Sequence, residues 1–555
     1  MMIMTCGRAA CAAMTLASLM PAKATAQPST ATGVVFHDAN SNARLDVNES
    51  GIEGVKVSNG LDVVVTDREG RWELPVTDDA IVFVIKPRGY RTPVDELHIP
   101  RFYYIHKPSG SADEGFIFEG VEPTGPLPRS IDFPLYKQDE SGPFSVLLFS
   151  DPQPYDIQQV RYYATEVLAD TSGTDAAFAI SLGDLLGDDL DLFEPFNRAQ
   201  ASVGVPFYNV YGNHDMNFMS PNDEQADETF NAVFGPANYI FQYGMVHFII
   251  LDNVYWKGFD GFPEGRGPWT GYARSEKRGF PRTGNYEGRL TDAQLTFLEN
   301  YLAHVPQHER VVICTHIPLE ADDAGSVHQV PQLDRLMAML SRFPNTLSFS
   351  GHTHLNRHWF FGSDRGYSNP QTDAHHHYNV GTASGSWWRG GKQANGIPHT
   401  LMADGTPNGY AVATFSGADY NLRFVAAGER GHHMRIIFPE ELGAESLADT
   451  AVLSNVWAAT GARSDVRMRV IAPGYVSAWR SLSFDPQIDP HYRDLQATER
   501  EMPNIGRAVP DPRESHNMFQ GTLDFSLEPG LYTLEVEATD MFGNTVSNRR
   551  AFSVR

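Results

Sequence analysis

Five apolar segments in the middle of the chain each end abruptly in polar residues. SVLLF, AAFAISL, VPFYNVY, VVIC and TLSFS are all followed within two residues by a carboxylate, amide or imidazole side chain. Short apolar runs of this kind indicate strands that are buried on both faces, as in α/β proteins. Helical patterns such as TDAQLTFLENYLAHV lie between them. We therefore expect a layered α/β domain over residues 144–395, with polar groups gathered where its strands end.

The first of these segments poses the problem most sharply. It ends in Asp151-Pro152-Gln153, and the proline prevents the strand from continuing as a regular ladder element. Residues i and i+2 can point to the same place, so Asp151 and Gln153 could offer two oxygen ligands to a cation. A helix N-cap would use the same residue types. The stretch alone leaves both interpretations open.

The ordered set of strand ends resembles a known family. Asp151-Pro152-Gln153, Gly183-Asp184, Gly212-Asn213-His214-Asp215, Thr315-His316 and Gly351-His352-Thr353-His354 are similar to the D-x-H, G-D, G-N-H-D, H and G-H-x-H motifs of calcineurin-like metallophosphoesterases. The resemblance covers about residues 144–390. It implies a layered β-sandwich core that binds two divalent metal ions. One ion would be held by Asp151, Gln153, Asp184 and His354, and the other by Asp184, Asn213, His316 and His352, with Asp184 bridging the two.

One position departs from the family pattern. Gln153 stands where the family usually has histidine, and an amide oxygen is a weaker and harder ligand than imidazole. The site is therefore expected to favour manganese or iron, although zinc would also fit. The D-x-Q form resembles that of the ADP-ribose/CDP-alcohol diphosphatases, so it does not imply an inactive site.

The resemblance also implies a mechanism. A hydroxide shared by the two metal ions would attack phosphorus. His214 would act as the general acid that protonates the leaving oxygen, and Asp215 would orient His214. The expected enzyme is a phosphoric ester hydrolase that acts on a small molecule, with phosphodiesters as the favoured substrates.

Two alternatives stay open at this stage. A phosphomonoesterase, including a protein phosphatase, would need an extra cation for the dianionic substrate. Arg266, Arg274, Lys277 and Arg278, in the long segment between Trp256 and Arg289, could supply one. The second alternative is a surface-binding protein with a decayed metal site, which would have lost several of the ligands rather than replaced one.

The flanking regions are expected to be β-rich modules. Alternating runs and turn clusters predict an N-terminal β-sandwich over 30–137 and a second β-sandwich module over 396–555, an arrangement that resembles a secreted bacterial subgroup of the family. The N-terminal module opens with a stretch that has the spacing of a calcium loop, but with alanine where that loop has glycine. It could bind calcium or form a polar turn, through the side chains of Asp38, Asn40, Asn42, Asp46 and Glu49.

The start of the chain and its charge bear on location and partners. Residues 1–26 have the pattern of a signal peptide, which predicts a secreted or periplasmic protein. Beyond residue 26, Cys314 is the only cysteine, so no disulfide within the chain is expected there. The formal net charge of −25 argues against nucleic acid polymers as partners. No segment after residue 26 is long and apolar enough to span a membrane, and the oligomeric state is left open.

Several weaker signals complete the predictions. His375-His376-His377 is read as a solvated loop, with phosphate contact as the alternative, and Asp188 and Asp189 as a helix N-cap or as groups behind the metal ligands. Asp252-Asn253 could lie on the substrate side. Trp387, Trp388 and Arg389 could contact substrate, or the tryptophans could be core. Cys314 is expected in the core.

Overall fold

The protein is described here by a computed structural model. The structure describes residues 29–111, 117–258, 286–321, 330–428, 431–503 and 505–555. The predicted signal peptide and the four cations between residues 266 and 278 lie outside these ranges. Within them, no helix combines the length and the apolar character needed to cross a lipid bilayer.

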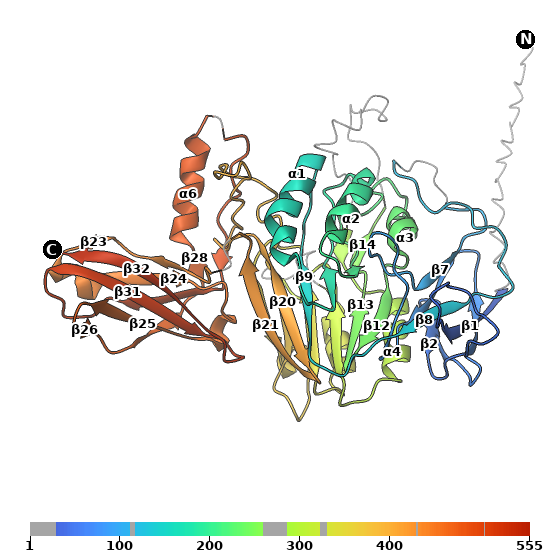
Figure 1. Cartoon of the computed structure of the whole chain (residues 1–555). Coiled ribbons are helices and arrows are strands. Elements are labelled where there is room, and N and C mark those ends of the chain that lie inside the picture. The colour runs from blue at the N-terminus through green and yellow to red at the C-terminus, as the bar shows by residue number, and fades with distance from the viewer. Residues whose placement is uncertain (1–28, 112–116, 259–285, 322–329, 429–430, 504) are drawn as a thin grey trace, which may run out of the picture.

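The N-terminal module is a β-sandwich of two four-stranded sheets, as expected from the sequence (Figure 1). One sheet has the order β4-β1-β8-β6, and the other has the order β3-β2-β5-β7. The strands are β1 Ser29–His37, β2 Lys56–Ser58, β3 Val63–Val65, β4 Arg71–Val76, β5 Ala80–Ile85, β6 Tyr90–Arg91, β7 Tyr103–His106 and β8 Phe133–Lys137.

Two sheets form the centre of the molecule. The five-stranded sheet has the order β11-β10-β9-β20-β21, and the six-stranded sheet has the order β12-β13-β16-β17-β19-β18. Their strands are β9 Phe144–Phe149, β10 Phe178–Ser181, β11 Phe207–Asn209, β12 Tyr239–Tyr243, β13 Val246–Ile250, β16 Arg310–Cys314, β17 Thr346–Ser350, β18 Arg357–Phe361, β19 His375–Asn379, β20 Gly409–Ser416 and β21 Asp419–Ala426. β9, β10 and β11 are parallel, and so are β13, β16, β17 and β19. Their carboxyl ends can therefore meet at one edge.

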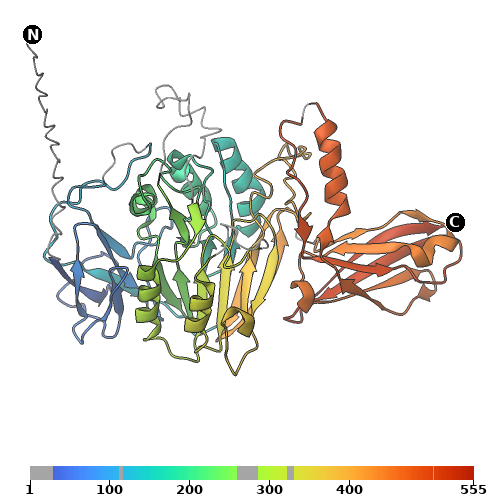
Figure 2. The same ribbon diagram turned by 180° about the vertical axis from the view of Figure 1, so that it is seen from behind.

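Helices cover the outer faces of both sheets. α1 Ile157–Tyr162, α2 Phe193–Ala201 and α3 Glu228–Phe234 lie on the side of the five-stranded sheet, and α1 continues without a break through a π-helical turn to residue 171. α4 Asp292–Leu302 and α5 Leu333–Leu340 cover the six-stranded sheet (Figure 2). Thr291 and Gln294 form a capping box at the start of α4, as its sequence predicts. β14 Val254–Trp256 and β15 Tyr286–Gly288 pair with each other on either side of residues 259–285.

The expected boundary between the catalytic domain and the C-terminal module was wrong. The sequence placed it at residue 395, but β20 pairs with β9 and β21 pairs with β20, so the central sheet extends to Ala426. Alternating strands of a central sheet and of a separate sandwich have the same pattern, and only their pairing partners distinguish them. Pairing with β9 assigns β20 and β21 to the catalytic core.

The C-terminal module has its own apolar core. Nine strands are hydrogen-bonded into one sheet, and a short two-stranded sheet and one helix face the catalytic core. The elements are β22 Arg435–Ile437, β23 Glu441–Leu442, β24 Ala451–Asn455, β25 Asp465–Ala472, β26 Tyr475–Val476, β27 Arg480–Phe484, β28 Gln487–Ile488, α6 Pro490–Glu501, β29 Glu514–Ser515, β30 Met518–Thr522, β31 Gly530–Thr539 and β32 Thr545–Val554.

The two flanking modules are joined to the core in different ways. The N-terminal module shares one apolar cluster with the core, where the Phe83 and Phe297 rings lie 6.0 Å apart. The C-terminal junction combines two small apolar clusters, one of which joins Met402 and Phe424 to Trp457, with buried amides. Asn517 donates to the backbone carbonyl of Asn356, and Asn356 in turn donates to that of Trp457.

Candidate metal centre

All seven predicted metal ligands lie at the carboxyl ends of the central strands. Asp151 and Gln153 follow β9, Asp184 follows β10, Asn213 follows β11, His316 follows β16, and His352 and His354 follow β17. Six of them are almost completely buried, and His352 is partly buried. Residues separated by some two hundred positions thus meet where the two sheets end together.

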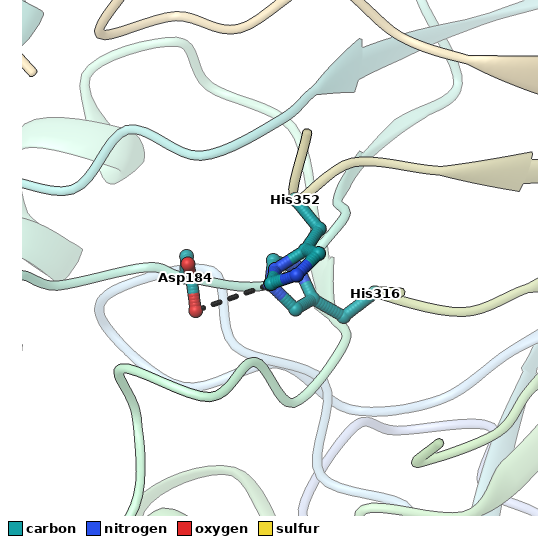
Figure 3. A group of neighbouring side chains, drawn as sticks. All are labelled: Asp184, His316 and His352. Atoms are coloured by element: carbon teal, nitrogen blue, oxygen red, sulfur yellow. Dashed lines mark hydrogen bonds and ion pairs between the residues drawn. The ribbon is translucent and has the colours of Figure 1, made fainter. Parts of the chain in front are cut away.

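The tightest part of the group consists of Asp184, His316 and His352 (Figure 3). Asp184 Oδ1 lies 3.2 Å from His316 Nε2, and His352 Nδ1 lies 3.2 Å from the same nitrogen. One ligand atom from each residue lies within 4.8 Å of the others. This spacing suits a single cation held by a carboxylate and two imidazoles.

The other four residues extend the group on both sides of Asp184. Asn213 Oδ1 lies 3.1 Å from His316 Nε2. Gln153 Nε2 donates to Asp184 Oδ2 over 3.0 Å, so Asp184 has one carboxylate oxygen toward each half of the group. His354 Nε2 and Asp151 Oδ1 lie 3.5 Å apart.

The backbone at these ligands is in an uncommon conformation. Asp151, Gln153, Asp184, His352 and His354 all have φ between 41° and 73°, which is the left-handed region that non-glycine residues seldom enter. Pro152 therefore sits between two left-handed residues, and the turn directs both side chains toward the centre. Such conformations carry a cost of about 1–3 kcal/mol each and persist where the surrounding fold imposes them.

Glycines beside the ligands permit the close approach of neighbouring strand ends. A Cβ at Gly212 would lie 2.0 Å from the backbone nitrogen of Asp184. A Cβ at Gly351 would lie 2.3 Å from Ser150 Oγ. Any side chain at either position would therefore separate the ligands.

Neighbouring groups fix the orientation of the ligands. His316 Nδ1 lies 2.8 Å from the carbonyl oxygen of Leu182, and His354 Nδ1 contacts the carbonyl oxygen of Gly385. Both rings therefore present Nε2 to the centre, as metal-binding histidines do when a carbonyl accepts from the other nitrogen. Ser150 donates to Asp151 Oδ2, which leaves Oδ1 toward the site.

The donor set fits divalent cations. Asp151 Oδ1 and Gln153 Oε1 are buried and have no hydrogen-bond donor among the described residues. Burial opposes the protonation of His316, but the Asp184 and Asp151 carboxylates outweigh it and raise the pKa of His316 to about 9. The space between these side chains therefore favours a positive charge. Carboxylate, amide and imidazole donors suit manganese, iron or zinc.

His214 lies beside this group, and its partner differs from the expected one. His214 Nδ1 is 2.8 Å from Asp188 Oδ1, and His214 Nε2 is 3.8 Å from Asp184 Oδ2. Asp215 does not contact the ring, because its carboxylate accepts from the backbone N–H groups of Gly212, Leu185 and Leu186. The prediction that Asp215 orients His214 was wrong, and Asp215 instead holds two ligand turns together.

Asp188 was expected either to cap a helix or to lie behind the metal ligands. The short helix that follows starts after Asp189 and has no side-chain cap, and Asp188 instead contacts His214, a pairing that the sequence reasoning did not identify. The sequence signal that could have placed Asp188 near His214 was its position four residues after the predicted ligand Asp184. Asp188 has φ 77°, which places it among the left-handed residues around the site.

A cleft of about 800 Å³ opens beside the metal-binding residues. Tyr155, Asp188, His214, Trp387 and Arg389 are among the residues that line it. Trp387 stacks on His354 with ring centroids 4.2 Å apart, so it belongs to the site. Trp388 is buried and donates to the carbonyl of Pro152 over 2.9 Å, which makes it structural.

His375-His376-His377 does not form a solvated loop. These residues make up most of β19 in the six-stranded sheet, and all three are buried. Ser348 Oγ lies 2.7 Å from both His375 Nε2 and His377 Nδ1, and Tyr420 OH lies 2.7 Å from His376 Nδ1. The prediction was wrong because three adjacent polar residues favour solvent unless neighbouring strands supply hydroxyl partners.

Two other weak signals have structural explanations. Asn253 exchanges hydrogen bonds with the backbone of Ile317, so it fixes the turn that follows His316. Asp252 accepts from Val254 N and lines a different cavity, next to the N-terminal module. Cys314 is fully buried in β16, and burial raises the pKa of its thiol, so the expected core position is confirmed.

The predicted calcium loop is a compact polar turn in this structure. Asp38 accepts from the backbone of Ser41 and Ala43, and Asn40 and Asn42 both donate to Asp46 Oδ2. Glu49 accepts from the backbone N–H groups at 39 and 46. Ala43 has φ 59°, the conformation for which a calcium loop has glycine. Calcium binding at this loop stays a prediction.

Comparison with known proteins identifies related sequences. Three family models match: the calcineurin-like phosphoesterase model over residues 144–356, the model of its N-terminal region over 39–122, and that of its C-terminal region over 377–546. No functionally curated protein matches significantly.

Two solved structures show weaker likeness. A purple acid phosphatase from yellow lupin (Lupinus luteus) seeds is 12% identical, with 72% of this chain and 67% of that chain covered and a TM-score of 0.33. A superoxide reductase (neelaredoxin) from Ignicoccus hospitalis is 13% identical, covering 22% and 81%, with a TM-score of 0.13. Likeness of this size carries no weight for the function.

Proposed function

The chain belongs to the calcineurin-like phosphoesterase family and is a metal-dependent phosphoesterase, and from this premise we propose that it hydrolyses phosphodiesters. His214 is the general acid. The ligands of two divalent ions are Asp151, Gln153, Asp184, Asn213, His316, His352 and His354.

One observation carries the proposal. Seven side chains from five strand ends converge on one place, and two of their oxygens, Asp151 Oδ1 and Gln153 Oε1, are buried with no hydrogen-bond donor among the residues that the structure describes. Buried polar atoms of this kind are costly unless a partner compensates them. A decayed site would not maintain five strained backbone positions and two such oxygens together.

The residues divide into two halves around Asp184. Asp151, Gln153 and His354 would hold one ion, and Asn213, His316 and His352 would hold the other, on the two sides of Asp184. When bound, the two ions supply positive charge beside the phosphoryl oxygens and make water more acidic. We expect manganese or iron in the half that contains Gln153, because its amide oxygen is a hard donor.

His214 is positioned to deliver a proton. Its Nδ1 is held by Asp188, and its ring lines the cleft in which a leaving group would lie. The Asp188 carboxylate accepts from Nδ1 and so fixes the ring with Nε2 free to face the substrate. Nε2 can then donate the proton to the oxygen that departs from phosphorus.

The size of the cleft favours diesters over monoesters. A diester has an organic group on each side of the phosphate, and a cleft of about 800 Å³ has room for a substituent beyond the metal ligands. A phosphomonoesterase is the competing function.

The proposal includes export from the cell. Residues 1–26 carry the pattern of a signal peptide, and the rest of the chain contains one cysteine, which is buried in β16. N-terminal sequencing of protein recovered from the native host's periplasm or medium would test this. An uncleaved N-terminus on protein found only in the cytosol would contradict it.

Metal replacement tests the activity. Metal-depleted protein is refilled with manganese, iron, zinc or calcium, and each form is assayed on bis(4-nitrophenyl) phosphate and on 4-nitrophenyl phosphate. We expect hydrolysis of the diester to be faster, with manganese or iron most effective. Faster hydrolysis of the monoester would favour the competing function, and inactivity on both substrates with every ion would refute hydrolysis.

A change at His214 tests its role. His214→Ala should lower kcat on alkyl phosphodiesters by about 10²–10⁴-fold, because an alkoxide needs a proton to leave. The loss on nitrophenyl esters should be smaller, since nitrophenolate leaves without one. Equal losses on both substrate classes would rule out the general-acid assignment.

A further inference from the structure

A second cavity, of about 710 Å³, lies between the N-terminal module and the catalytic core. The N-terminal module contributes residues around the start of β5, and the core contributes residues around α3, β14 and the start of α4. Within the described part of the chain, Arg289 is the one cation that lines it, and this arginine pairs with Glu287 and lies over the Tyr255 ring. Four carboxylates of the core line the same cavity: Asp223, Glu224, Asp227 and Asp252. The cavity is therefore strongly negative.

These four carboxylates form no ion pair with any residue that the structure describes. Asp252 Oδ1 accepts from Val254 N over 2.8 Å, and Asp223 Oδ1 accepts from Trp256 N over 2.6 Å. No described residue donates a hydrogen bond to Oδ2 of either aspartate. Asp79, which lines the cavity from the N-terminal module, differs because it pairs with Lys107 over 2.6 Å. The carboxylates of the core are thus left for a cation from outside the described chain.

Two buried polar side chains in this region also lack a partner. Asn231 lines the cavity and is only 7% exposed, and its Oδ1 accepts no hydrogen bond from the described residues. The buried hydroxyl of Tyr211 has no hydrogen-bond partner among them either. Burial raises the pKa of Tyr211, and the charges of the three aspartates raise it further, which places this hydroxyl near them. Buried polar atoms are costly unless a partner compensates them, so the amide oxygen of Asn231 needs a donor that the described residues do not supply.

Ionised carboxylates are unfavourable in this cavity. Burial, together with the charge of Glu228, raises the pKa of Asp227 to about 7, while the ordinary value is 3.8. Burial raises the pKa of Asp223 to about 6. A cation beside these groups would favour their charged form and remove the penalty.

The spacing of the acidic groups distinguishes between kinds of cation. Among the described residues, the one set of three ionisable side chains whose ligand atoms all lie within 4.8 Å of one another is at the metal centre. The carboxylates of this cavity are therefore too far apart for three of them to hold one metal ion. The cavity also has apolar walls, which include Ile81, Ala237, Val254 and Ala293. Separate negative charges together with apolar walls suit a chain of methylene groups that carries several ammonium groups.

We propose that this cavity binds an aliphatic polyamine such as spermidine. Its ammonium groups lie at Asp223, Asp227 and Asp252, and one of them donates to Asn231 Oδ1 through a charge-assisted hydrogen bond. Its methylene segments pack on the apolar walls. Because the N-terminal module and the core both line the cavity, the bound polyamine stabilises their junction. The cavity contains none of the proposed metal ligands, so the proposal goes beyond the phosphodiesterase function and does not depend on it.

Calorimetric titration of the full-length protein tests the proposal. Spermidine and putrescine are titrated at a constant ionic strength of about 0.15 M, where interactions between distant exposed charges are screened. Spermidine should bind at one saturable site and about tenfold more tightly than putrescine, because it forms one more charge-assisted contact. The absence of a saturable spermidine site would overturn the proposal. Displacement of spermidine by calcium chloride, beyond that caused by sodium chloride at the same ionic strength, would overturn it too, since the cavity would then bind a metal ion.

Removal of one charge locates the site. Asp227→Asn keeps the shape of the side chain but not its charge, and it should weaken spermidine binding about tenfold or more. Asp292→Asn is the matched control, because Asp292 is exposed, pairs with Arg335 and precedes the cavity residue Ala293 without lining the cavity itself. Its effect should be less than about twofold, since solvent and salt screen its charge. Equal losses in the two variants would indicate adsorption to the acidic surface and overturn the site.

A tethered ammonium group gives a second test in which no buried group is lost. Ala293 is exposed in the first turn of α4 and lines the cavity, and lysine is a good helix former. Ala293→Lys should weaken spermidine binding about tenfold or more, because its ammonium group competes for the same carboxylates. Ala293→Gln, which adds a long side chain without charge, should weaken binding less. Wild-type affinity in folded Ala293→Lys would contradict a polyamine site in this cavity.

Discussion

Two groups of buried histidines lie in the same region of the protein and have opposite surroundings. His316, at the end of β16, lies beside Asp184, and its pKa is raised to about 9. His375, two strands away in β19, has hydroxyl partners from Ser348 and Thr346, and burial lowers its pKa to about 3. Both side chains are completely buried. Burial of histidine therefore says little about function, whereas the Asp184 carboxylate distinguishes His316 from the histidines of β19.

The backbone separates the two groups as well. Five of the predicted ligands have left-handed φ values, while His375 to His377 follow the regular geometry of a strand that pairs on both sides. The metal centre thus concentrates strain and charge at strand ends. The histidines of β19, together with His358, form an uncharged cluster that we call the buried histidine cluster.

The largest effect is expected at the carboxylate that distinguishes the two groups. Asp184→Asn removes the negative charge shared by both halves of the metal centre, which should cost several kcal/mol of transition-state stabilisation, or about 10³-fold or more in kcat/KM. Bound metal, measured by elemental analysis, should fall as well. Because we assign the buried histidine cluster no part in catalysis, the folded fraction of His376→Gln should retain the metal content and the kcat/KM of the wild type. Loss of metal from folded His376→Gln would show that the buried histidine cluster also contributes to metal binding.

Acid should act on the buried histidine cluster next most strongly. His358 and His375 have pKa values lowered to about 3, while the ordinary value is 6.5. The unfolded chain takes up protons below pH 6.5, and the folded protein does not, so the stability that these groups contribute is complete above pH 6.5 and is lost as pH falls toward 3. Linkage gives about 1.4 kcal/mol per histidine per pH unit, or about 2 kcal/mol each between pH 6.5 and 5.

Urea unfolding across this pH range measures the effect. His316 provides the internal contrast, because a pKa that is raised in the folded protein does not lower the free energy of unfolding as the pH falls. A His375→Asn variant should show a shallower fall of the unfolding free energy with decreasing pH. A flat profile in the wild-type protein would contradict neutral burial of the cluster.

A smaller change removes the hydroxyl that links two members of the cluster. Ser348→Ala leaves His375 Nε2 and His377 Nδ1 without their shared partner, which should lower the unfolding free energy by about 1–3 kcal/mol. Metal content and kcat should stay as in wild type, since neither histidine reaches the metal centre. Chemical denaturation together with elemental analysis tests both parts. Retained stability would show that the cluster tolerates an unpaired nitrogen.

The smallest expected effect is at Asp188, which makes His214 unlike the cluster. Asp188→Asn removes the carboxylate beside His214 and should lower kcat on alkyl esters by about tenfold, while KM changes little. The loss should be smaller on nitrophenyl esters, because nitrophenolate leaves without a proton. Equal losses on both ester classes would indicate that Asp188 has a structural role only.

The sequence predicted that the proposed metal ligands would lie together, because each one follows an apolar strand directly. An apolar strand followed by glycine and one polar group leaves little choice of location, and five such ends in order point to one edge. It could not predict the partner of His214, because Asp215 is adjacent in sequence whereas Asp188 lies 26 residues away, and only the geometry of the turns brings Asp188 to the ring. The placement of β19 and of β20 failed for a related reason, because both depend on which strand lies alongside.

The contact between Gly390 and Arg507 brings the C-terminal module to the edge of the cleft. The proposed metal ligands belong to the central sandwich, but one guanidinium of the cleft belongs to the neighbouring module. An exchange of that module between relatives would alter which compound is accepted while the reactive apparatus stays intact. Selectivity in this architecture can therefore evolve by recombination at a domain border, without mutation of the catalytic core.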